Sequence, residues 1–255
     1  MSLQDVFSDI YRKRKWGSGY SASGDGSDPD VARPYVNYVN DVLRQYGVKS
    51  VLDIGHGDWR MWPEEAFLGT DYIGIDVAIG VSESARQEFA NSRRQFLSLN
   101  AVEDELPPGQ LVLLKDVLQH LSDRDVARLL GRVRSRPLVL ICHDISWEPT
   151  SLVARWNRVR WQLAPRARLS LLMSGKPPFR RLGRPQNSDI PSGEYRCLDL
   201  EQPPWSLADF DLELLRKHDI GTAKGASAFS KKRIWLLRGS SNEDELPAAV
   251  EDCPR

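Results

Sequence analysis

Two short apolar runs, the first ending in a glycine turn and the second in a carboxylate, constrain the fold of this chain more than any other feature. The first run covers residues 50–54 and leads into Gly55 and Gly57, while the second ends at Asp76. Both runs have the length and composition of buried strands. In a parallel sheet, the turn and the carboxylate lie at the same edge. There Asp76 can accept hydrogen bonds from both hydroxyls of a ribose, so the pattern predicts a nucleoside site.

The residues around the turn discriminate between nucleoside ligands. A dinucleotide fingerprint needs a third glycine, and Arg60 occupies that position. Asp58, directly after the second glycine, would repel a pyrophosphate, but its charge favours a ligand with an ammonium group and a sulfonium. S-adenosylmethionine is such a ligand. We also expect a helix to begin within residues 59–67, so that backbone N–H groups face the ligand.

These residues resemble the cofactor motifs of the class I S-adenosylmethionine-dependent methyltransferases. Asp53, Gly55 and Gly57 match motif I, and Asp76 matches the acidic residue of motif II. The chain departs from the family at His56, where most members carry a small residue or a cysteine. This departure changes the wall of the pocket but keeps the turn. The resemblance implies S-adenosylmethionine as the cofactor and a Rossmann-like sheet of seven strands.

Strand-like and helix-like segments alternate along the chain. Such alternation predicts an α/β fold with a mostly parallel sheet, helices on both faces and a ligand at the carboxyl ends of the strands. The expected helices cover residues 3–14, 34–46, 82–90 and 123–133. The expected strands, seven as in the resembling family, cover residues 48–54, 71–75, 95–99, 111–115, 138–142, 210–215 and 233–237.

Length and composition restrict the class of protein. The 255 residues suit one large domain, and 35 basic residues balance 35 acidic ones, so the net charge attracts neither nucleic acid nor anionic lipid. Three cysteines without a Cys-x-x-Cys spacing argue against a disulfide framework. No apolar run approaches the ~20 residues of a membrane span, and residues 1–16 carry charges where a signal peptide has an apolar core. We therefore expect a cytoplasmic protein with no membrane span and no nucleic-acid partner.

Residues 1–30 are expected to form a helix and a loop that covers the cofactor. The loop, residues 16–27, is rich in glycine and serine, which would also suit a flexible linker. Its large aromatic side chains favour the covering role, because a spacer does not need them. We expect Trp16, Ser23 and Gly24 to contact the cofactor.

Two further segments interrupt or follow the methyltransferase domain, which we assign to residues 31–238. Residues 149–188 carry nine basic residues and no acidic one. This insertion is either a solvated basic helix, a wall or lid for a polar or anionic acceptor, or an oligomer contact, for which a homodimer is the expected assembly. Residues 239–255 are polar, acidic and interrupted by proline, which predicts a disordered tail.

Imidazole and carboxylate groups follow the fourth and fifth expected strands. Lys115 and Asp116 end the fourth strand, with His120 just beyond, and the fifth strand runs into His143 and Asp144. A neutral histidine can take the proton of an attacking hydroxyl near pH 7, particularly when a carboxylate orients its ring. We expect His143 to be this base, His120 to be the second candidate and Asp116 to orient it. The family resemblance also implies that Lys115 contacts the cofactor. The alternative is a structural pairing of these groups.

The same imidazole and carboxylate groups could instead bind a metal ion. Asp116, His143 and Asp144 could hold Mg²⁺, which prefers one or two carboxylates together with substrate oxygens. Their spacing matches no metal motif, and zinc is less expected still, because the chain has no Cys/His cluster.

Asn100 and Ala101 follow the third expected strand. In the resembling family, an acidic or amide side chain at this place often meets the adenine amino group, which implies an adenine contact here. Asn100 could equally cap a turn.

A late segment, residues 187–205, is polar and broken by prolines, which predicts a structured loop. Together with the Trp-Gly loop near the N-terminus, it resembles a subgroup of bacterial class I methyltransferases from glycan and sugar pathways. The shared pattern is Asn-x-Asp-Ile-x-x-Gly-x-Trp/Tyr-Arg. It implies a sugar acceptor stacked on Tyr195 or Trp205, with hydroxyls bound by Asn187, Asp189 and Arg196. Each of these side chains could instead brace the loop.

The sequence thus favours an S-adenosylmethionine-dependent O-methyltransferase that acts on a sugar hydroxyl of an oligosaccharide or glycan precursor. Methylation of another small molecule or of RNA is the first alternative. The second is a regulator that binds S-adenosylmethionine without chemistry, although such a protein needs no histidines and carboxylates at its strand ends.

Overall fold

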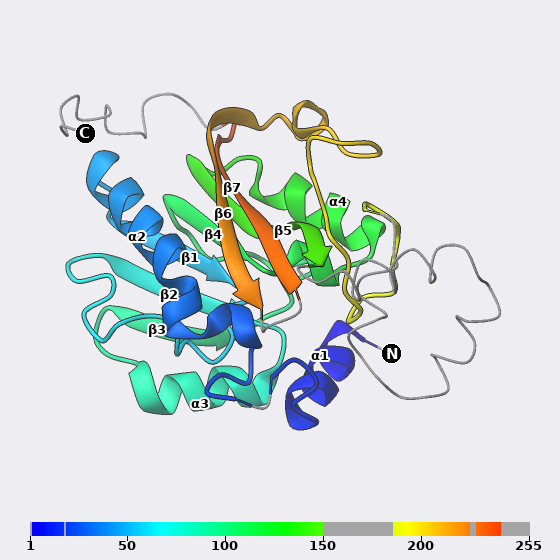
Figure 1. Cartoon of the computed structure of the whole chain (residues 1–255). Helices are drawn as coiled ribbons and strands as arrows, with labels where there is room; N and C mark the ends of the chain where they lie inside the picture. The colour runs from blue at the N-terminus through cyan, green and yellow to red at the C-terminus, as the bar shows by residue number, and fades with distance from the viewer. Residues whose placement is uncertain (1, 18, 150–185, 225–227, 241–255) are drawn as a thin grey trace.

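Seven strands form a single sheet in the described part of the computed structural model, which covers residues 2–17, 19–149, 186–224 and 228–240 (Figure 1). Across the sheet the order is β3-β2-β1-β4-β5-β7-β6. Strands β1 to β5 run parallel, and β7 is antiparallel to β5 and β6. This confirms the predicted mostly parallel sheet. The strands are β1 (Ser50–Ile54), β2 (Asp71–Asp76), β3 (Arg94–Ser98), β4 (Leu111–Lys115), β5 (Leu138–Pro149), β6 (Glu213–Lys224) and β7 (Ala228–Arg238).

The helices begin where side chains satisfy the free N–H groups of their first turns. Ser122 caps α4 (Asp123–Val133) by accepting the N–H of Asp125. Asp28 caps α2 (Pro29–Gln45), which therefore starts five residues before the predicted position and continues through Pro34. The other helices are α1 (Leu3–Arg12) and α3 (Ile79–Phe89), with short 3-10 turns η1 (Asp25–Ser27), η2 (Leu118–His120) and η3 (Leu207–Phe210).

Two apolar cores lie on opposite faces of the sheet, because successive side chains of a strand point to opposite sides. On one face α2 packs with residues 59–67, and Tyr35 and Trp59 are among the buried side chains. On the other face α1, α4 and the loop at residues 198–212 pack against Leu52, Val112 and Val139. Helices α2 and α4 accordingly flank the sheet on its two sides in Figure 1.

The helix predicted within residues 59–67 does not form, and this part of the sequence analysis is wrong. The segment is a series of turns, in which Trp59 and Phe67 adopt left-handed φ values of 59° and 62°. Pro63 interrupts any helical ladder at its centre. Burial of Trp59, Trp62 and Phe67 against the sheet holds the turns in place. The tertiary contacts of these aromatic rings decide the local conformation.

The last two strands are longer than predicted. The expected strand at 210–215 is displaced, because Phe210 ends η3 and β6 begins at Glu213. Strand β6 lies at the edge of the sheet, and the hairpin with β7 continues to Lys224 and Ala228. An edge strand can carry charged residues on both faces, so it lacks the apolar pattern from which strands are recognised.

Most of the predicted basic insertion lies outside the described residues, which include only 149 and 186–188 of it. The same holds for the predicted tail, of which residues 239–240 are described. Among the helices of the described chain, none combines the length and apolar composition that crossing a bilayer would require.

Candidate functional site

A cavity opens at the carboxyl ends of β1 to β4, beneath α1 and the loop that follows it. This is the sheet edge at which the glycine turn and the second carboxylate were expected to meet. Every predicted cofactor contact except Asp53 lines it. The lining residues from the predictions are Trp16, Ser23, Gly24, Gly55, Gly57, Asp76, Asn100, Ala101, Lys115, Asp116, His120 and Tyr195.

The two glycines after β1 are required by both conformation and space. Gly55 and Gly57 have φ values of 74° and 62°, in the left-handed region that favours glycine. A Cβ on Gly55 would lie 2.5 Å from Cγ2 of Val117, and one on Gly57 would lie 2.4 Å from Oγ of Ser23. The backbone of this turn therefore lies so close to Val117, after β4, and to Ser23, in the N-terminal loop, that neither glycine leaves room for a side chain.

Asp76 presents a carboxylate to the cavity from the end of β2. It accepts the N–H groups of Gly57 (3.2 Å) and Ala78 (2.9 Å). Burial raises the pKa of Asp76 to about 6, because desolvation outweighs these backbone hydrogen bonds. A donor from a ligand would stabilise the ionised form further.

Asp53 does not line the cavity, contrary to the prediction of a direct cofactor contact. It is 2% exposed inside β1 and accepts the hydroxyl of Tyr72 at 2.7 Å. Burial raises its pKa to about 6 as well. Asp53 alternates with Leu52 and Ile54 along β1, so its side chain points to the opposite face of the sheet, where Tyr72 belongs to the core beneath α2.

Asp58 fastens the N-terminal loop, and it does not face the cavity as its charge had suggested. Its carboxylate accepts the hydroxyl of Ser21 (2.9 Å) and the N–H of Ala22 (2.7 Å). In return, the N–H of Asp58 donates to Oγ of Ser23 (2.8 Å). Trp16 closes the loop at its other end by packing against Tyr11, with ring centroids 5.4 Å apart. These contacts hold the loop beside the cavity, and its role in covering a cofactor stays a prediction.

His56 forms part of the cavity wall, at a position where most members of the resembling family carry a small residue or a cysteine. Its ring is 4% exposed and meets Phe96 edge-on at 5.0 Å. Burial lowers the pKa of His56 to about 4, so this imidazole is neutral near pH 7. It therefore adds an uncharged ring to the cavity.

Asp116 directly follows β4, has a left-handed φ of 58° and is surrounded by cationic and amide groups. Its oxygens accept from Lys115 (2.6 Å), Gln119 (3.2 Å) and Lys232. Lys115 also donates to the carbonyl oxygen of Gly26 at 2.8 Å, which ties the covering loop to the end of β4. The Asp116 carboxylate is thus held by three neighbouring side chains at the cavity.

Lys232 is a neighbour of Asp116 that the sequence analysis missed. It lies on β7 in register with Asp144, is 1% exposed, and its Nζ reaches both Asp116 and Asp144 (3.5 Å). Burial alone lowers the pKa of Lys232, but the two carboxylates outweigh it and hold the pKa above the usual range. Only the register of the β5–β7 pair could have indicated this contact, because 88 residues separate the lysine from its nearer partner in sequence.

His120 is held at the cavity by contacts on several sides. Its Nδ1 lies 2.9 Å from the carbonyl oxygen of Glu194, and its Nε2 lies 3.4 Å from Nε2 of Gln119. Its ring packs on Trp16 (4.6 Å) and Tyr195 (5.7 Å). The imidazole therefore has a defined orientation on the cavity wall.

His143, the first candidate for the base, lies away from the cavity. It is fully buried and packs on Trp235 with a centroid distance of 4.9 Å. Burial lowers its pKa to about 3. Alternate residues of β5 point to opposite sides, so a histidine at this position enters the core while the strand continues past it to Pro149. The structure therefore argues against His143 as a base.

Asp116 and Asp144 do not form a metal site in this structure. Asp144 is fully buried, accepts the hydroxyl of Tyr195 (2.8 Å) and faces Lys232. An ammonium group between two carboxylates occupies the place that a cation would need. Among the described residues, no group of three or more His, Cys, Asp or Glu side chains could hold a metal ion.

Asn100 uses its side chain within its own turn while lining the cavity. Its amide donates to Glu103 (3.0 Å), and its carbonyl oxygen accepts the N–H of Val102 (3.1 Å). This is the turn-cap alternative. Ala101 lines the cavity next to it.

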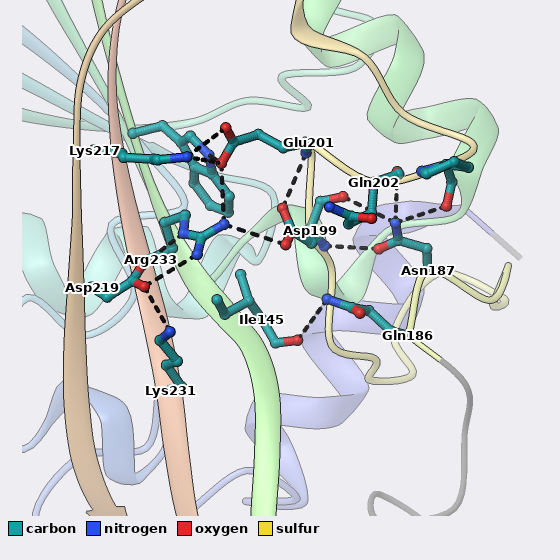
Figure 2. Close-up of polar contacts among 12 residues, drawn as sticks. Ile145, Gln186, Asn187, Asp199, Glu201, Gln202, Lys217, Asp219, Lys231 and Arg233 are labelled. Atoms are coloured by element: carbon teal, nitrogen blue, oxygen red, sulfur yellow. Dashed lines mark hydrogen bonds and ion pairs between the residues drawn. The ribbon is translucent and has the colours of Figure 1, made fainter.

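The late segment contributes one side chain to the cavity, Tyr195, and the other predicted sugar contacts brace the loop. Asn187 donates to the carbonyl oxygens of Asp199, Gln202 and Pro203, as Figure 2 shows in part. Asp189 accepts the N–H groups of Asp123 and Ile190. Arg196 is 1% exposed and ion-paired with Asp123, and Trp205 belongs to the apolar core.

Comparisons with known proteins find structural neighbours alone, since no family model and no curated sequence matches the chain. A methyltransferase from Anabaena variabilis that depends on S-adenosylmethionine has a TM-score of 0.58 and 12% identity, with 94% of this chain and 96% of that chain covered. The 1,6-didemethyltoxoflavin-N1-methyltransferase of Burkholderia thailandensis, solved with 1,6-didemethyltoxoflavin and S-adenosylhomocysteine, has a TM-score of 0.57 and 14% identity over 94% and 88% of the two chains.

A third neighbour is the magnesium protoporphyrin IX methyltransferase of Synechocystis PCC 6803, solved with S-adenosylhomocysteine. Its TM-score is 0.55 with 14% identity, and 93% of this chain and 98% of that chain are covered. At such identities, the likeness shows the fold: this chain has the fold of the S-adenosylmethionine-dependent methyltransferases. The names of two of these neighbours give different acceptors, magnesium protoporphyrin IX and 1,6-didemethyltoxoflavin, so the fold by itself does not select one.

Proposed function

We propose that this chain is an S-adenosylmethionine-dependent methyltransferase whose acceptor is a sugar hydroxyl. The observation that carries the proposal is one cavity whose lining includes both the residues expected to bind the cofactor and a side chain that can accept a proton. Asp76 and the Gly55–Gly57 turn form one wall, and His120 forms another. A cofactor site and a proton acceptor in one cavity are what a methyl transfer to a hydroxyl needs.

The cavity residues suit the cofactor. Asp76 can accept both ribose hydroxyls, and Gly57 leaves room for backbone contact beside it. The loop at Trp16, Ser23 and Gly24 covers the cavity and can exclude water. When bound, S-adenosylmethionine supplies a methyl group on a cationic sulfur, which an oxygen nucleophile attacks in line.

His120 takes the role of general base in this proposal. It lines the cavity, and its orientation is fixed by Glu194 and by ring packing on Trp16. An acceptor hydroxyl would give its proton to this imidazole as the new O–CH₃ bond forms. Asp116 is best described as an organiser, because Lys115 and Lys232 already engage its oxygens.

A sugar acceptor is supported by sequence resemblance and by one side chain. The late segment resembles that of sugar O-methyltransferases, including the 1-O-methyltransferase of methylmannose polysaccharide assembly. Tyr195 presents its ring to the cavity while its hydroxyl is held by Asp144. An aromatic face of this kind suits stacking on the apolar side of a sugar ring.

The direct test is a screen of acceptor sugars with methyl-labelled cofactor, run with and without a chelator. We expect transfer to at least one sugar and no effect of the chelator, because Asp116 and Asp144, the carboxylates considered for a metal, are paired with lysines. Turnover of another metabolite with no transfer to any sugar would overturn the acceptor assignment. Binding of cofactor without turnover on any acceptor would favour the regulator.

Cofactor affinity should depend on pH through Asp76. The pKa of this carboxyl in the free protein is about 6, and the ionised form accepts both ribose hydroxyls better than the protonated form does. The Kd for S-adenosylhomocysteine should therefore be constant above pH 7 and rise below pH 6, approaching about tenfold per pH unit. Calorimetry between pH 5 and 8 measures this. In Asp76→Asn the binding should be weak at every pH, and an unchanged slope would point to another titrating group.

Replacing His120 with glutamine should lower kcat and leave cofactor binding intact. A general base contributes about 10²–10⁴-fold, so we expect a loss in that range. His218→Gln is the matched control, because His218 is exposed on β6 and its ring stacks on Tyr38, a residue that does not line the cavity. Equal activity of the two variants on a sugar acceptor would remove His120 from the mechanism.

A further inference from the structure

Three consecutive residues around His120 are bonded to one short segment of the late loop, residues 193–196. The N–H of Gly193 donates to the carbonyl oxygen of His120 (2.8 Å), and the N–H of Arg196 donates to that of Gln119 (3.1 Å). The guanidinium of Arg196 donates to the carbonyl oxygen of Leu121 (3.0 Å). The backbone of the η2 turn is thus held at each residue from 119 to 121.

The same segment determines which nitrogen of His120 carries the proton. A carbonyl oxygen only accepts hydrogen bonds, so the 2.9 Å contact between Nδ1 and the oxygen of Glu194 requires a proton on Nδ1. In the neutral ring, Nε2 then has the lone pair. The 3.4 Å approach of the Gln119 amide to Nε2 agrees with this, because an amide N–H can donate to it.

Arg196 secures the segment from within. Its side chain is fully buried and is ion-paired with Asp123 at the start of α4. It also donates to the carbonyl oxygen of Ser188 at 3.0 Å, so one planar guanidinium joins the late loop, η2 and α4. A lysine could not make these divergent contacts, since it is a point charge on a flexible stem.

Two further contacts keep residues 193–196 in place. Tyr195 donates to Asp144, whose carboxylate is in turn held by Lys232. Gly193 has a φ of 95°, and a Cβ there would lie 2.3 Å from Cγ1 of Val6 in α1. The segment therefore fits between β5, η2 and α1 in one position.

We propose that Arg196 is a positioning residue for His120. It holds residues 193–196 so that the carbonyl of Glu194 keeps the proton on Nδ1 and the lone pair on Nε2, where the acceptor hydroxyl would take the place of the Gln119 N–H and deliver its proton. During transfer the acceptor oxygen bonds to the methyl carbon as the carbon–sulfur bond breaks, and the hydroxyl proton moves to Nε2. This inference rests on the proposed function and gives the late loop a role other than the sugar binding first expected of Asn187, Asp189 and Arg196.

The tautomer can be measured without knowing the acceptor. The chain has four histidines, so protein labelled with ¹⁵N in histidine gives four pairs of ring resonances. These resonances distinguish a protonated from an unprotonated ring nitrogen, and His120→Gln assigns the pair of interest. In the wild-type protein near pH 7, we expect a single neutral form of His120 with its proton on Nδ1.

Arg196→Lys is the decisive variant, because it keeps the positive charge opposite Asp123 and removes the planar guanidinium that donates to Ser188 and Leu121. We expect His120 to become a mixture of tautomers in this variant, while the Kd for S-adenosylhomocysteine is unchanged. Arg233→Met is the matched control. Arg233 is anchored to the same late loop through Asp199 and Glu201 (Figure 2), but it does not contact residues 119–121 in the described structure. The control should keep the wild-type spectrum.

The results of these experiments distinguish a failure of this inference from a failure of the proposed function. A wild-type His120 with its proton on Nε2, or an Arg196→Lys variant that folds and keeps a single Nδ1–H form, overturns the positioning role. Absence of cofactor binding in the wild-type protein overturns the proposed function and leaves the tautomer result standing. With an identified acceptor, kcat of Arg196→Lys should fall by about 10- to 100-fold, part of the contribution of a base, with KM unaffected.

Discussion

Replacing Gly57 with alanine is expected to weaken binding of S-adenosylhomocysteine by about 100-fold, the equivalent of about 2.7 kcal/mol. The new Cβ would lie 2.4 Å from Oγ of Ser23 and 3.1 Å from its Cβ. Ser23 cannot move away alone, because Asp58 and Tyr11 bond its hydroxyl. The covering loop must therefore shift as a unit, which opens the cavity at the cofactor wall. Calorimetry of the two proteins measures the loss.

Gly69→Ala is the control that isolates this contact. Gly69 also has a positive φ, 79°, but a Cβ there would meet no atom within 4 Å. Both variants carry the backbone strain of a left-handed alanine, about 1 kcal/mol. The strain should lower the thermal stability of both variants, and the clash with Ser23 should lower that of Gly57→Ala further, while only Gly57→Ala loses affinity. Comparable affinity in the two variants would show that loop 21–24 does not shape the cofactor site.

Replacing Asn187 with aspartate is expected to destabilise the protein by at least about 3 kcal/mol. The amide group of Asn187 donates to three backbone carbonyl oxygens at 2.9, 2.9 and 3.0 Å, and its oxygen accepts the N–H of Asp199 at 2.7 Å. The side chain is 7% exposed. An aspartate would place a buried negative charge against three carbonyl oxygens and remove the N–H donors that they share, although the backbone N–H groups of Gln202 and Trp205 still reach the oxygens of Asp199 and Gln202. The left-handed φ of 59° is tolerated by both residues, so the backbone contributes little to the difference.

Asn91→Asp is the matched control for this substitution. Asn91 is exposed, and its side-chain oxygen accepts the N–H of Arg93 at 2.9 Å, a bond that an aspartate also makes. Its stability in urea should therefore be close to that of the wild-type protein. If Asn187→Asp is equally stable but no longer supports turnover, Asn187 binds the acceptor and does not brace the loop.

The sheet was predictable because its strands are local, apolar and separated by helical segments with recognisable ends. β4 and α4 were predicted at their observed bounds, since a buried run and a serine cap mark them. The turns at residues 59–67 were not predictable, because they depend on aromatic rings that pack on a distant part of the sheet. The edge strand β6 was misplaced for the opposite reason, since solvent exposure removes the apolar pattern.

The sequence by itself determined one wall of the cavity. Gly55, Gly57 and Asp76 follow two strands directly, so their meeting at one edge depends only on parallel pairing of neighbours. The tertiary structure alone decided which histidine reaches the cavity. His143 and His120 both follow a strand in sequence, but β5 continues past the first and buries it, whereas η2 turns the second toward the cavity, with the late loop against it. Contacts such as Lys232 with Asp116 or Arg196 with Leu121 join residues far apart in the chain, and their geometry arises only when the whole sheet has closed around them.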